Sequence, residues 1–379
     1  MMPENLYLIA SGGNPNYGDE LIVASWLRFL ARVRPQATVW LDCPQPGTAS
    51  ALFAGLHPHL RTTNTLWRSC SEAPNQTAEG VWQHVDNVVA HGGTPMYDVG
   101  LMALGQAHSI HLLGGGYVNG VWPDHVGLVA GMAAVRKLNG CRLMGSGLGL
   151  MPLPENAEQL AKTFADFAAL SVRDVASSRF LGIETGLDDV FLGLLHELRR
   201  SADSERAQAA AKDVMLCIQS DMTDDATFSH LRDKLGAVIQ ESLAQGLSVG
   251  YVEAIPGSDR RMYDALEGLI PEQNFVPFTQ VWAEGLPVRR GQHWYTSRFH
   301  PHLVAAAAGA KGVAIGIRDD YYDIKHRSLL DLGTGWTYAS AKDETGLPMP
   351  TGSPQFEERA LRYSSHKRSE ALALYPVIQ

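Results

Sequence analysis

The sequence predicts an α/β protein with two domains, each built on a parallel β-sheet. Short apolar runs alternate with amphipathic segments along most of the chain, which is typical of β/α units around parallel sheets. The chain has 379 residues, enough for two domains of ordinary size. Its composition, 45% hydrophobic and 19% charged, is that of a globular protein with a large core.

Apolar runs predict the strands of the first domain. They lie at Leu6–Ala10, Thr38–Cys43, Ser109–Leu113, Cys141–Gly145 and Leu170–Val172. A helix is expected after the first strand, because apolar residues recur there at helical spacing from Ile22 to Val33.

A second set of runs predicts the other domain. Its strands are expected at Val214–Ile218, Leu247–Val252, Phe275–Phe278 and Val313–Ile317, with a helix over Ala226–Ala244. The polar end of Val190–Ala211 is typical of a linker, and Phe356–Leu374 has a helical pattern. We therefore predict two Rossmann-like domains that face each other across a cleft (residues 1–195 and 212–350), followed by a helical tail (residues 351–379).

Charge and cysteine content narrow the functional classes. The net charge of -9 argues against a nucleic-acid-binding protein, since there is no excess of Lys and Arg to neutralise phosphates. The four cysteines, Cys43, Cys70, Cys141 and Cys217, form no CxxC pair, so buried free thiols are expected. We see neither a signal-peptide pattern nor an apolar run long enough to cross a bilayer, and expect a cytoplasmic location.

The segment Ser297–His302 contains the strongest candidate site. Pro301 fits the first position of a helix, which would place His300 at the cap and Arg298 just before it. A helix N-terminus attracts anions through its free N–H groups and its dipole. The pair therefore indicates an active site for a phosphorylated or carboxylated substrate. The alternative for His300 alone is a capping or core histidine, and the His300/His302 pair lacks the further ligands of a metal site.

Two loops of the first domain are further candidates. The loop Ser11–Asp19 follows the first strand, where α/β sheets place ligand loops, and Asp19 either caps the next helix or serves the site. Gly114 and Gly115, in the run Gly114-Gly115-Gly116, leave backbone N–H groups open to an anion, although a tight turn also needs glycine. The run Gly145–Gly149 is expected to be a similar turn.

Two more cations are candidates. Arg173 follows the strand Leu170–Val172, next to Asp174, which is expected to cap a helix. Arg173 either forms a salt bridge on the rim of the site or contacts the ligand. Lys325 follows the strand Val313–Ile317 and either adds positive charge to the same cleft or is a surface lysine.

Taken in order, these motifs resemble the polysaccharide pyruvyl transferase family. The similar blocks are Asn16-Tyr17-Gly18-Asp19, Gly114-Gly115-Gly116, Gly145-Ser146-Gly147-Leu148-Gly149, Arg173-Asp174 with Ser177, Arg298-Phe299-His300, and Val313–Gly316 with Lys325 and Leu332-Gly333. They cover about residues 6 to 335, and their order and spacing carry the resemblance. The resemblance implies a fold like that of the two-domain GT-B glycosyltransferases.

The resemblance also implies a reaction. A member of this family transfers pyruvate from phosphoenolpyruvate to two hydroxyls of a sugar, which gives a cyclic ketal and releases phosphate. On this basis His300 and Asp19 are the expected catalytic residues, and Arg173, Arg298, Gly114, Gly115 and Lys325 are expected to bind phosphoenolpyruvate. Phosphoenolpyruvate is a substrate, and we expect neither a cofactor nor a metal.

The chain departs from the family pattern at several positions. Phe299 stands where leucine is usual, Ser146 where glutamine is common, and Asp189 where a proline is usual. These changes leave the acceptor open. Galactose, glucose, mannose and N-acetylmannosamine units are all compatible, in a polysaccharide, a glycolipid or a lipid-linked precursor.

The sequence leaves other points open. A lipid-linked acceptor would make the protein peripheral at the inner face of the membrane, and the sequence does not indicate an oligomeric state. The alternative function is a nucleotide-sugar-dependent GT-B glycosyltransferase, in which Glu253 could bind the ribose. A third alternative is a non-catalytic sugar-binding protein with the same fold.

Overall fold

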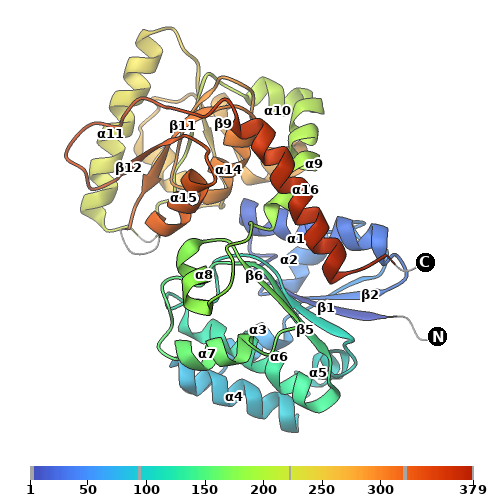
Figure 1. Cartoon of the computed structure of the whole chain (residues 1–379). Coiled ribbons are helices and arrows are strands. Elements are labelled where there is room, and N and C mark those ends of the chain that lie inside the picture. Colours follow the sequence, from blue (N-terminus) through green and yellow to red (C-terminus); the bar gives the residue numbers. More distant parts are fainter. Residues whose placement is uncertain (1–3, 93–94, 222, 319–321, 378–379) are drawn as a thin grey trace. The chain divides into compact units, whose positions relative to one another are not determined.

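The computed structural model describes residues 4–92, 95–221, 223–318 and 322–377. The chain divides into two compact units (Figure 1). Unit 1 consists of the chain up to Asn14, the segment Asp19–Leu192 and the chain from His366 onward. Unit 2 consists of Pro15–Gly18 and Gly193–Ser365. Helices α1 (Tyr17–Val33), α9 (Val190–Asp203) and α16 (Phe356–Leu374) each contain residues of both units.

Unit 1 is built on a six-stranded sheet whose strands are all parallel. The strand order is β3-β2-β1-β4-β5-β6, the order typical of dinucleotide-binding folds. The strands are β1 (Asn5–Ile9), β2 (Thr38–Asp42), β3 (Leu60–Thr63), β4 (Ser109–Leu112), β5 (Arg142–Leu148) and β6 (Ala169–Val172). All four residues of β4 and the last four residues of β1 are buried, as expected for strands covered on both faces.

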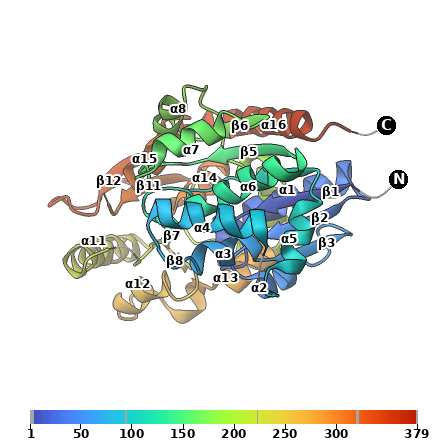
Figure 2. The ribbon, with the colours of Figure 1, turned by 90° about the horizontal axis from the view of Figure 1, so that it is seen from below.

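Helices cover the sheet of unit 1. Figure 2 shows α3, α4 and α6 gathered over one face, where their apolar side chains form a core with β1 and β4. The helices within unit 1 are α2 (Pro46–Leu52), α3 (Thr65–Ser71), α4 (Ala78–His91), α5 (Asp98–Gly105), α6 (Val126–Asn139), α7 (Ala157–Phe164) and α8 (Val175–Leu181), with the short 3₁₀ helix η1 (Pro123–His125).

Unit 2 repeats the topology of unit 1. Its six parallel strands have the order β12-β11-β10-β7-β8-β9, which is the same sequence of positions read from the other edge. The strands are β7 (Val214–Cys217), β8 (Val249–Val252), β9 (Phe275–Val276), β10 (His293–Thr296), β11 (Lys311–Gly316) and β12 (Thr337–Ser340). The helices are α10 (Glu205–Ala210), α11 (Asp225–Ala244), α12 (Arg260–Ala265), α13 (Phe278–Glu284), α14 (Phe299–Ala307) and α15 (Tyr322–Asp331), with the 3₁₀ helix η2 (Glu272–Asn274).

The predicted fold class is confirmed, with corrections to single elements. The expected turn at Gly145–Gly149 is wrong, because β5 continues to Leu148. The strand tolerates these glycines because its register shifts between Gly145 and Leu148, and Gly147 has a φ of 59°. Strands β3, β10 and β12 were not predicted individually, since each is four residues long and contains polar residues. The polar segment after Val190 forms α9 and α10.

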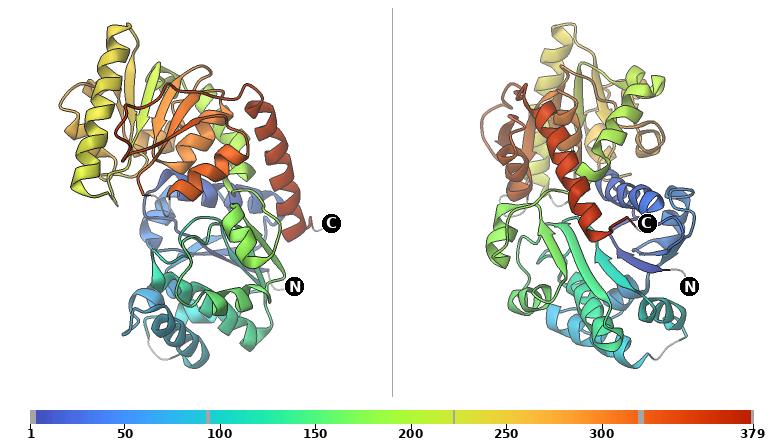
Figure 3. Two further views of the ribbon diagram at one scale, coloured as in Figure 1. Left: turned by 60° about the vertical axis from the view of Figure 1, so that its left-hand side comes forward. Right: turned by 45° about the vertical axis from the view of Figure 1, so that its right-hand side comes forward.

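A buried ion pair anchors the second half of α16 in unit 1. Lys367 Nζ lies 2.6 Å from Asp189 Oδ1 and 3.0 Å from Glu370 Oε2, and the Lys367 and Asp189 side chains are fully buried. Burial alone would lower the pKa of Lys367, but Asp189 and Glu370 together raise it above its usual value. Near the end of the helix, Arg142 of β5 donates to the Leu374 carbonyl oxygen (2.9 Å), so the last turns of α16 lie beside this sheet (Figure 3).

We predict that Lys367→Met lowers the free energy of unfolding by about 3–5 kcal/mol, because it leaves the buried Asp189 charge without its cation. Urea denaturation of the purified variant measures this. The control is Lys137→Met, which removes a cation that is 72% exposed and pairs with Asp86 at 3.1 Å. Surface pairs of that kind contribute about 0–1 kcal/mol. Equal losses in the two variants would contradict the anchoring role.

Candidate functional site

Five of the seven sequence-predicted site residues follow strands that flank the point where the strand order of each sheet reverses. The other two are Arg173, which follows β6, and Lys325, which lies in α15 after β11. In unit 1 this switch point is between β1 and β4, and in unit 2 it is between β7 and β10. Ligands of α/β proteins bind at such points. Asp19, Gly114 and Gly115 follow β1 and β4, while Arg298 and His300 follow β10.

The first loop places Asp19 in the first turn of α1. Asn16 caps the helix, since its Oδ1 accepts from the Gly18 N–H at 3.3 Å. Asp19 is therefore not the capping residue, although an acidic side chain in a first turn suits the helix dipole. A Cβ atom added to Gly115 would lie 3.9 Å from Asp19 Oδ1, so unit 1 brings the Asp19 carboxylate close to the Gly114–Gly116 turn.

Asp189 explains one glycine in each of two glycine-rich segments of unit 1, namely Gly114 and Gly147. Its Oδ2 accepts from the Gly114 N–H (2.9 Å), Ser146 Oγ (2.7 Å) and Trp26 Nε1 (2.7 Å). A Cβ atom at Gly114 would lie 2.9 Å from Asp189 Cγ, and one at Gly147 would lie 2.8 Å from Asp189 Oδ1. The glycines thus make room for a buried carboxylate, and the Gly114 N–H that we expected to face a ligand donates to that carboxylate.

Arg173 is held in a buried salt bridge. Its Nη1 lies 2.6 Å from Asp188 Oδ2, and the two side chains are 4% and 2% exposed. A salt bridge was one of the two expectations for Arg173, but the pair is buried and not on a rim. A Cβ atom at Gly149 would lie 3.0 Å from Arg173 Nε, so the end of the β5 segment passes directly over the guanidinium group. The prediction that Asp174 caps α8 is confirmed, because it accepts from the Ser177 N–H at 2.8 Å.

In unit 2, α14 begins two residues earlier than the sequence predicted. Arg298, with an extended backbone, is the N-cap residue, and the helix starts at Phe299. Pro301 is therefore the third helical residue and not the first. This position also tolerates proline, because the first four N–H groups of a helix have no partner within it. His300 is then inside the first turn, and its side chain is 8% exposed.

Two carboxylates, the buried Asp259 and the exposed Asp221, hold Arg298. Its Nε and Nη2 both donate to Asp259 Oδ1 (3.0 and 2.5 Å), and Nη2 also donates to Asp221 Oδ1 (3.0 Å). Asp259 is fully buried, and its Oδ2 accepts from the N–H groups of Ala254 and Ile255. Burial raises the pKa of Asp259, although Arg298 lowers it in part. Asp259 was not predicted from the sequence, because it lies 39 residues before Arg298 and carries no motif of its own.

The imidazole of His300 lies against Gly18. A Cβ atom added to Gly18 would be 1.6 Å from His300 Nδ1, so no side chain fits at this position unless the imidazole moves. Tyr17 fixes this loop within unit 2, as its N–H donates to the Ala254 carbonyl oxygen (3.0 Å) and its hydroxyl to Glu197 (3.0 Å). Phe299 packs its ring edge-on to His300, with centroids 4.9 Å apart. The structure thus brings together Gly18 and His300, which are 282 residues apart in the sequence.

Other candidates take different places. Lys325 is half-buried near the start of α15. Both Glu253 oxygens accept from backbone N–H groups, those of Gly257 (2.9 Å) and Phe278 (3.2 Å), so the observed contacts give Glu253 a role in holding the loop after β8. Trp294 and Tyr295 are core residues, at 0% and 5% exposed. All four cysteines are buried and free, as predicted.

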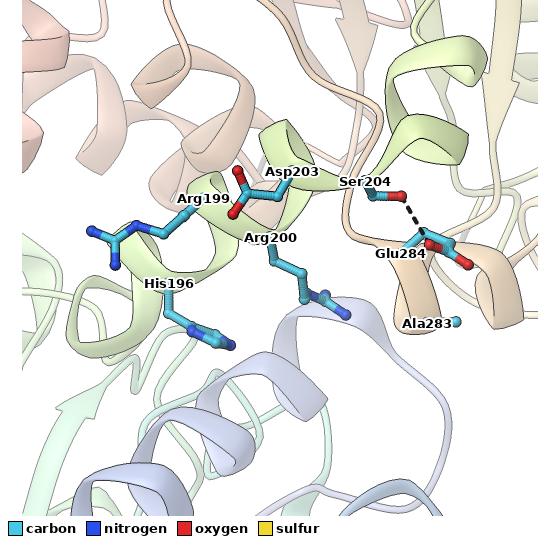
Figure 4. A pocket seen from close by; sticks show the side chains of 7 residues that line it. All are labelled: His196, Arg199, Arg200, Asp203, Ser204, Ala283 and Glu284. Carbon is cyan, nitrogen blue, oxygen red and sulfur yellow. Dashed lines mark hydrogen bonds between the residues drawn. The ribbon is translucent and has the colours of Figure 1, made fainter.

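A pocket of about 350 Å³ lies elsewhere in unit 2, beside α9 and α13 (Figure 4). Its lining is charged, but Arg200 is paired with Glu197 (2.6 Å), and Ser204 donates to Glu284 (2.8 Å). None of the sequence-predicted site residues lines it. The pocket residues are His196, Arg199, Arg200, Asp203, Ser204, Ala283 and Glu284.

Comparison with known proteins identifies the class. The sequence profile of the family "Polysaccharide pyruvyl transferase" matches residues 16–319, most of the chain. The chain therefore belongs to the polysaccharide pyruvyl transferase family, as the motifs predicted. No curated protein matches the chain.

Solved structures support the GT-B-like fold. The UDP-GlcNAc 2-epimerase from Neisseria meningitidis, solved with UDP-GlcNAc, is similar over 99% of this chain and 94% of its own, with a TM-score of 0.55 and 10% identity. MnaA from S. aureus, solved with UDP, is similar over 98% and 89%, with a TM-score of 0.55 and 9% identity. At these identities the likeness concerns the fold alone.

No helix in the described part of the chain is both long and apolar enough to cross a bilayer.

Buried neutral histidines predict a loss of stability in acid. Burial lowers the pKa of His111 to about 3 and that of His326 to about 4, and it lowers the pKa of His302 well below its usual value. Below about pH 6.5 the unfolded chain binds protons at these histidines that the folded chain excludes, so stability falls as pH falls. Burial raises the pKa of Asp42 to about 6 and also raises that of Asp259, so these two carboxylates act in the opposite direction, but the three histidines outnumber them.

We therefore expect the free energy of unfolding to decrease steadily between pH 6.5 and pH 4, as measured by urea denaturation. His111→Asn should flatten this slope, whereas His91→Gln, at an exposed position, should leave it unchanged. A slope that His111→Asn does not alter would contradict the assignment of a neutral buried imidazole.

Proposed function

We propose that this protein transfers pyruvate from phosphoenolpyruvate to two hydroxyls of a sugar, which forms a cyclic ketal and releases phosphate. The observation that carries the proposal is the turn from β10 to α14. There Arg298, oriented by the buried Asp259, lies two residues before His300, whose imidazole is held against the Gly18 backbone. Membership of the polysaccharide pyruvyl transferase family supports the same reaction.

The donor needs cationic groups with fixed directions. Phosphoenolpyruvate carries a carboxylate and a phosphate, and a guanidinium group can bind either with two parallel hydrogen bonds. We assign phosphoenolpyruvate binding to Arg298 and Lys325 in unit 2 and to Arg173 and Gly115 in unit 1, but not to the Gly114 N–H, which donates to Asp189. The buried partners of the two arginines, Asp259 and Asp188, fix the planes of the guanidinium groups before a ligand arrives. Hydrogen-bond donors that are already oriented before the substrate binds stabilise a transition state more effectively.

His300 is assigned as the acid. A proton delivered to the methylene carbon of phosphoenolpyruvate makes the neighbouring carbon electrophilic, and a sugar hydroxyl attacks that carbon. Phosphate then leaves, and a second hydroxyl closes the ring. Imidazole side chains titrate near pH 6.5, so they can give up a proton near neutrality. Asp19 is assigned to accept the proton of the attacking hydroxyl or to orient the sugar.

The acceptor is proposed only as a class. It is a sugar unit in a polysaccharide, a glycolipid or a precursor, which would make the enzyme part of cell-envelope biosynthesis in the cytoplasm. The alternative function, a nucleotide-sugar glycosyltransferase, needs a nucleotide-binding site in the second domain, where an acidic residue could bind the ribose. Glu253 was the candidate for that role, and its contacts to Gly257 and Phe278 explain it without a nucleotide.

The test is phosphate release from phosphoenolpyruvate by the purified protein with a panel of sugar acceptors, followed by mass spectrometry of the products. We expect one acceptor to gain a pyruvate ketal. We also expect phosphoenolpyruvate to raise the melting temperature, because a ligand of the native state stabilises it. If nucleotide sugars raise the melting temperature and phosphoenolpyruvate does not, the alternative function is correct.

We predict that His300→Ala lowers kcat by about 10²–10⁴-fold, the usual contribution of a positioned acid or base, while the affinity for phosphoenolpyruvate changes little. Steady-state kinetics and calorimetric binding measure the two quantities. A variant that keeps most of the wild-type kcat would remove His300 from the catalytic role.

Gly18→Ala is the matched variant, because it moves the imidazole without removing it. Alanine is favoured over glycine in a helix by about 1 kcal/mol, which offsets part of the cost of moving the buried imidazole. The displaced His300 should lower kcat strongly. A fully active Gly18→Ala protein would show that the position of the imidazole against this loop does not matter for the reaction.

A further inference from the structure

Behind the turn that carries Arg298 and His300, unit 2 contains a buried pair of histidines. His302 belongs to α14 and His326 to α15, and neither is exposed to solvent. Their Nδ1 atoms are 3.2 Å apart. The outer nitrogens also have partners, since His302 Nε2 lies 3.1 Å from Thr334 Oγ1, and His326 Nε2 lies 3.2 Å from the Ser297 carbonyl oxygen.

These three contacts fix the position of every proton in the chain. A carbonyl oxygen can only accept, so His326 Nε2 carries a proton and donates to Ser297. In a neutral imidazole the other nitrogen is then an acceptor, so His326 Nδ1 accepts from His302 Nδ1–H. His302 Nε2 is left as an acceptor for the Thr334 hydroxyl. The result is a one-way chain from Thr334 through His302 and His326 to the Ser297 carbonyl.

The surroundings keep both rings neutral. Trp336 stacks on His302 with centroids 4.3 Å apart, and burial lowers the pKa of both histidines, that of His326 to about 4. A protonated His326 would present an N–H to the N–H of His302, which would break the chain. Both nitrogens of each ring are occupied, which leaves no lone pair for a metal ion.

The chain joins the segments that bear the proposed donor-binding residues. Ser297 directly precedes Arg298, and His326 directly follows Lys325. Ser297 is also held from the other side, because its Oγ accepts from the Gln219 N–H (2.9 Å) at the end of β7. We propose that the His302–His326 pair is a positioning device that sets the start of α14 against α15, and so fixes Arg298 and His300 relative to Lys325. This inference rests on the proposed function.

Two substitutions at His326 test its contacts with Ser297 and with His302 separately. Glutamine can place an amide N–H near the Nε2 position and keep the bond to the Ser297 carbonyl. Asparagine can place its oxygen near the Nδ1 position and keep the bond to His302, but it releases Ser297. Both variants lose part of a buried ring, so both should lose stability to a similar extent.

We expect His326→Asn to raise the KM for phosphoenolpyruvate by about tenfold or more, because a misplacement of about 1 Å can cost up to 10²-fold in rate. His326→Gln should stay within about threefold of the wild type. The matched control is His57→Asn in unit 1. His57 is also buried, its Nε2 lies 3.2 Å from the Arg34 carbonyl oxygen, and its Nδ1 accepts from the His59 N–H (3.1 Å). The His57→Asn substitution should leave the KM for phosphoenolpyruvate unchanged.

Equal KM changes in His326→Asn and His326→Gln would overturn the proposal, as would an unchanged KM in His326→Asn. If KM changes in proportion to the loss of melting temperature in every variant, including His57→Asn, the histidine pair has a purely structural role and the proposal is overturned.

A second measurement separates this inference from the proposed function. In ¹⁵N NMR spectra of the wild-type protein near neutral pH, with signals assigned by the His302 and His326 variants, His302 should carry its proton on Nδ1 and His326 on Nε2. Any other tautomers overturn the chain itself, whatever the substrate. The expected tautomers in a protein that does not bind phosphoenolpyruvate would mean that the chain is correct and the proposed function has failed.

Discussion

The carboxylate of Asp189 lies out of reach of solvent and is satisfied by donors from four parts of unit 1: the Gly114 turn, Ser146 of β5, Trp26 of α1 and Lys367 of α16. An ionised group in such a place is tolerated only when its partners are complete. The packing of the glycine turns, the sheet and the C-terminal helix around it is therefore a single coupled arrangement. Burial raises the pKa of Asp189, but Lys367 lowers it below its usual value, so the pair stays charged.

Unit 2 uses the same device at the corresponding edge of its sheet. Asp259 is fully buried, accepts from two backbone N–H groups of the loop after β8, and holds Arg298 through its other oxygen. In both units a buried aspartate joins a loop at the carboxyl edge to a distant cation. This correspondence is found only in the structure, where the two sheets have the same strand order. No repeat is detectable in the sequence.

The sequence was sufficient for the elements with strong periodicity and for the motifs. The strands β1, β2, β4 and β7, the helix α11 and the capping role of Asp174 follow from local pattern, and so does the position of Arg298 at a strand-to-helix turn. The partners of Arg173 and Arg298 could not be predicted from local pattern. Asp188 and Asp259 are ordinary acidic residues until the fold brings them to Arg173 and Arg298, and the approach of Gly18 to His300 joins segments with no local relation. The start of α14 was misplaced because proline is compatible with more than one position in a first turn.

These partners change how an anionic donor would be recognised. Arg173 and Arg298 each already face a carboxylate, and Arg298 faces a second one in Asp221, so neither provides an unbalanced positive charge. The aspartates instead fix the orientation of each guanidinium group. A guanidinium group held in an ion pair loses less conformational freedom when it forms further hydrogen bonds. The neutral His302–His326 chain serves the same end without adding charge. For the proposed reaction, a rigid set of donors matters more than net charge, which is consistent with an acidic chain that acts on an anion.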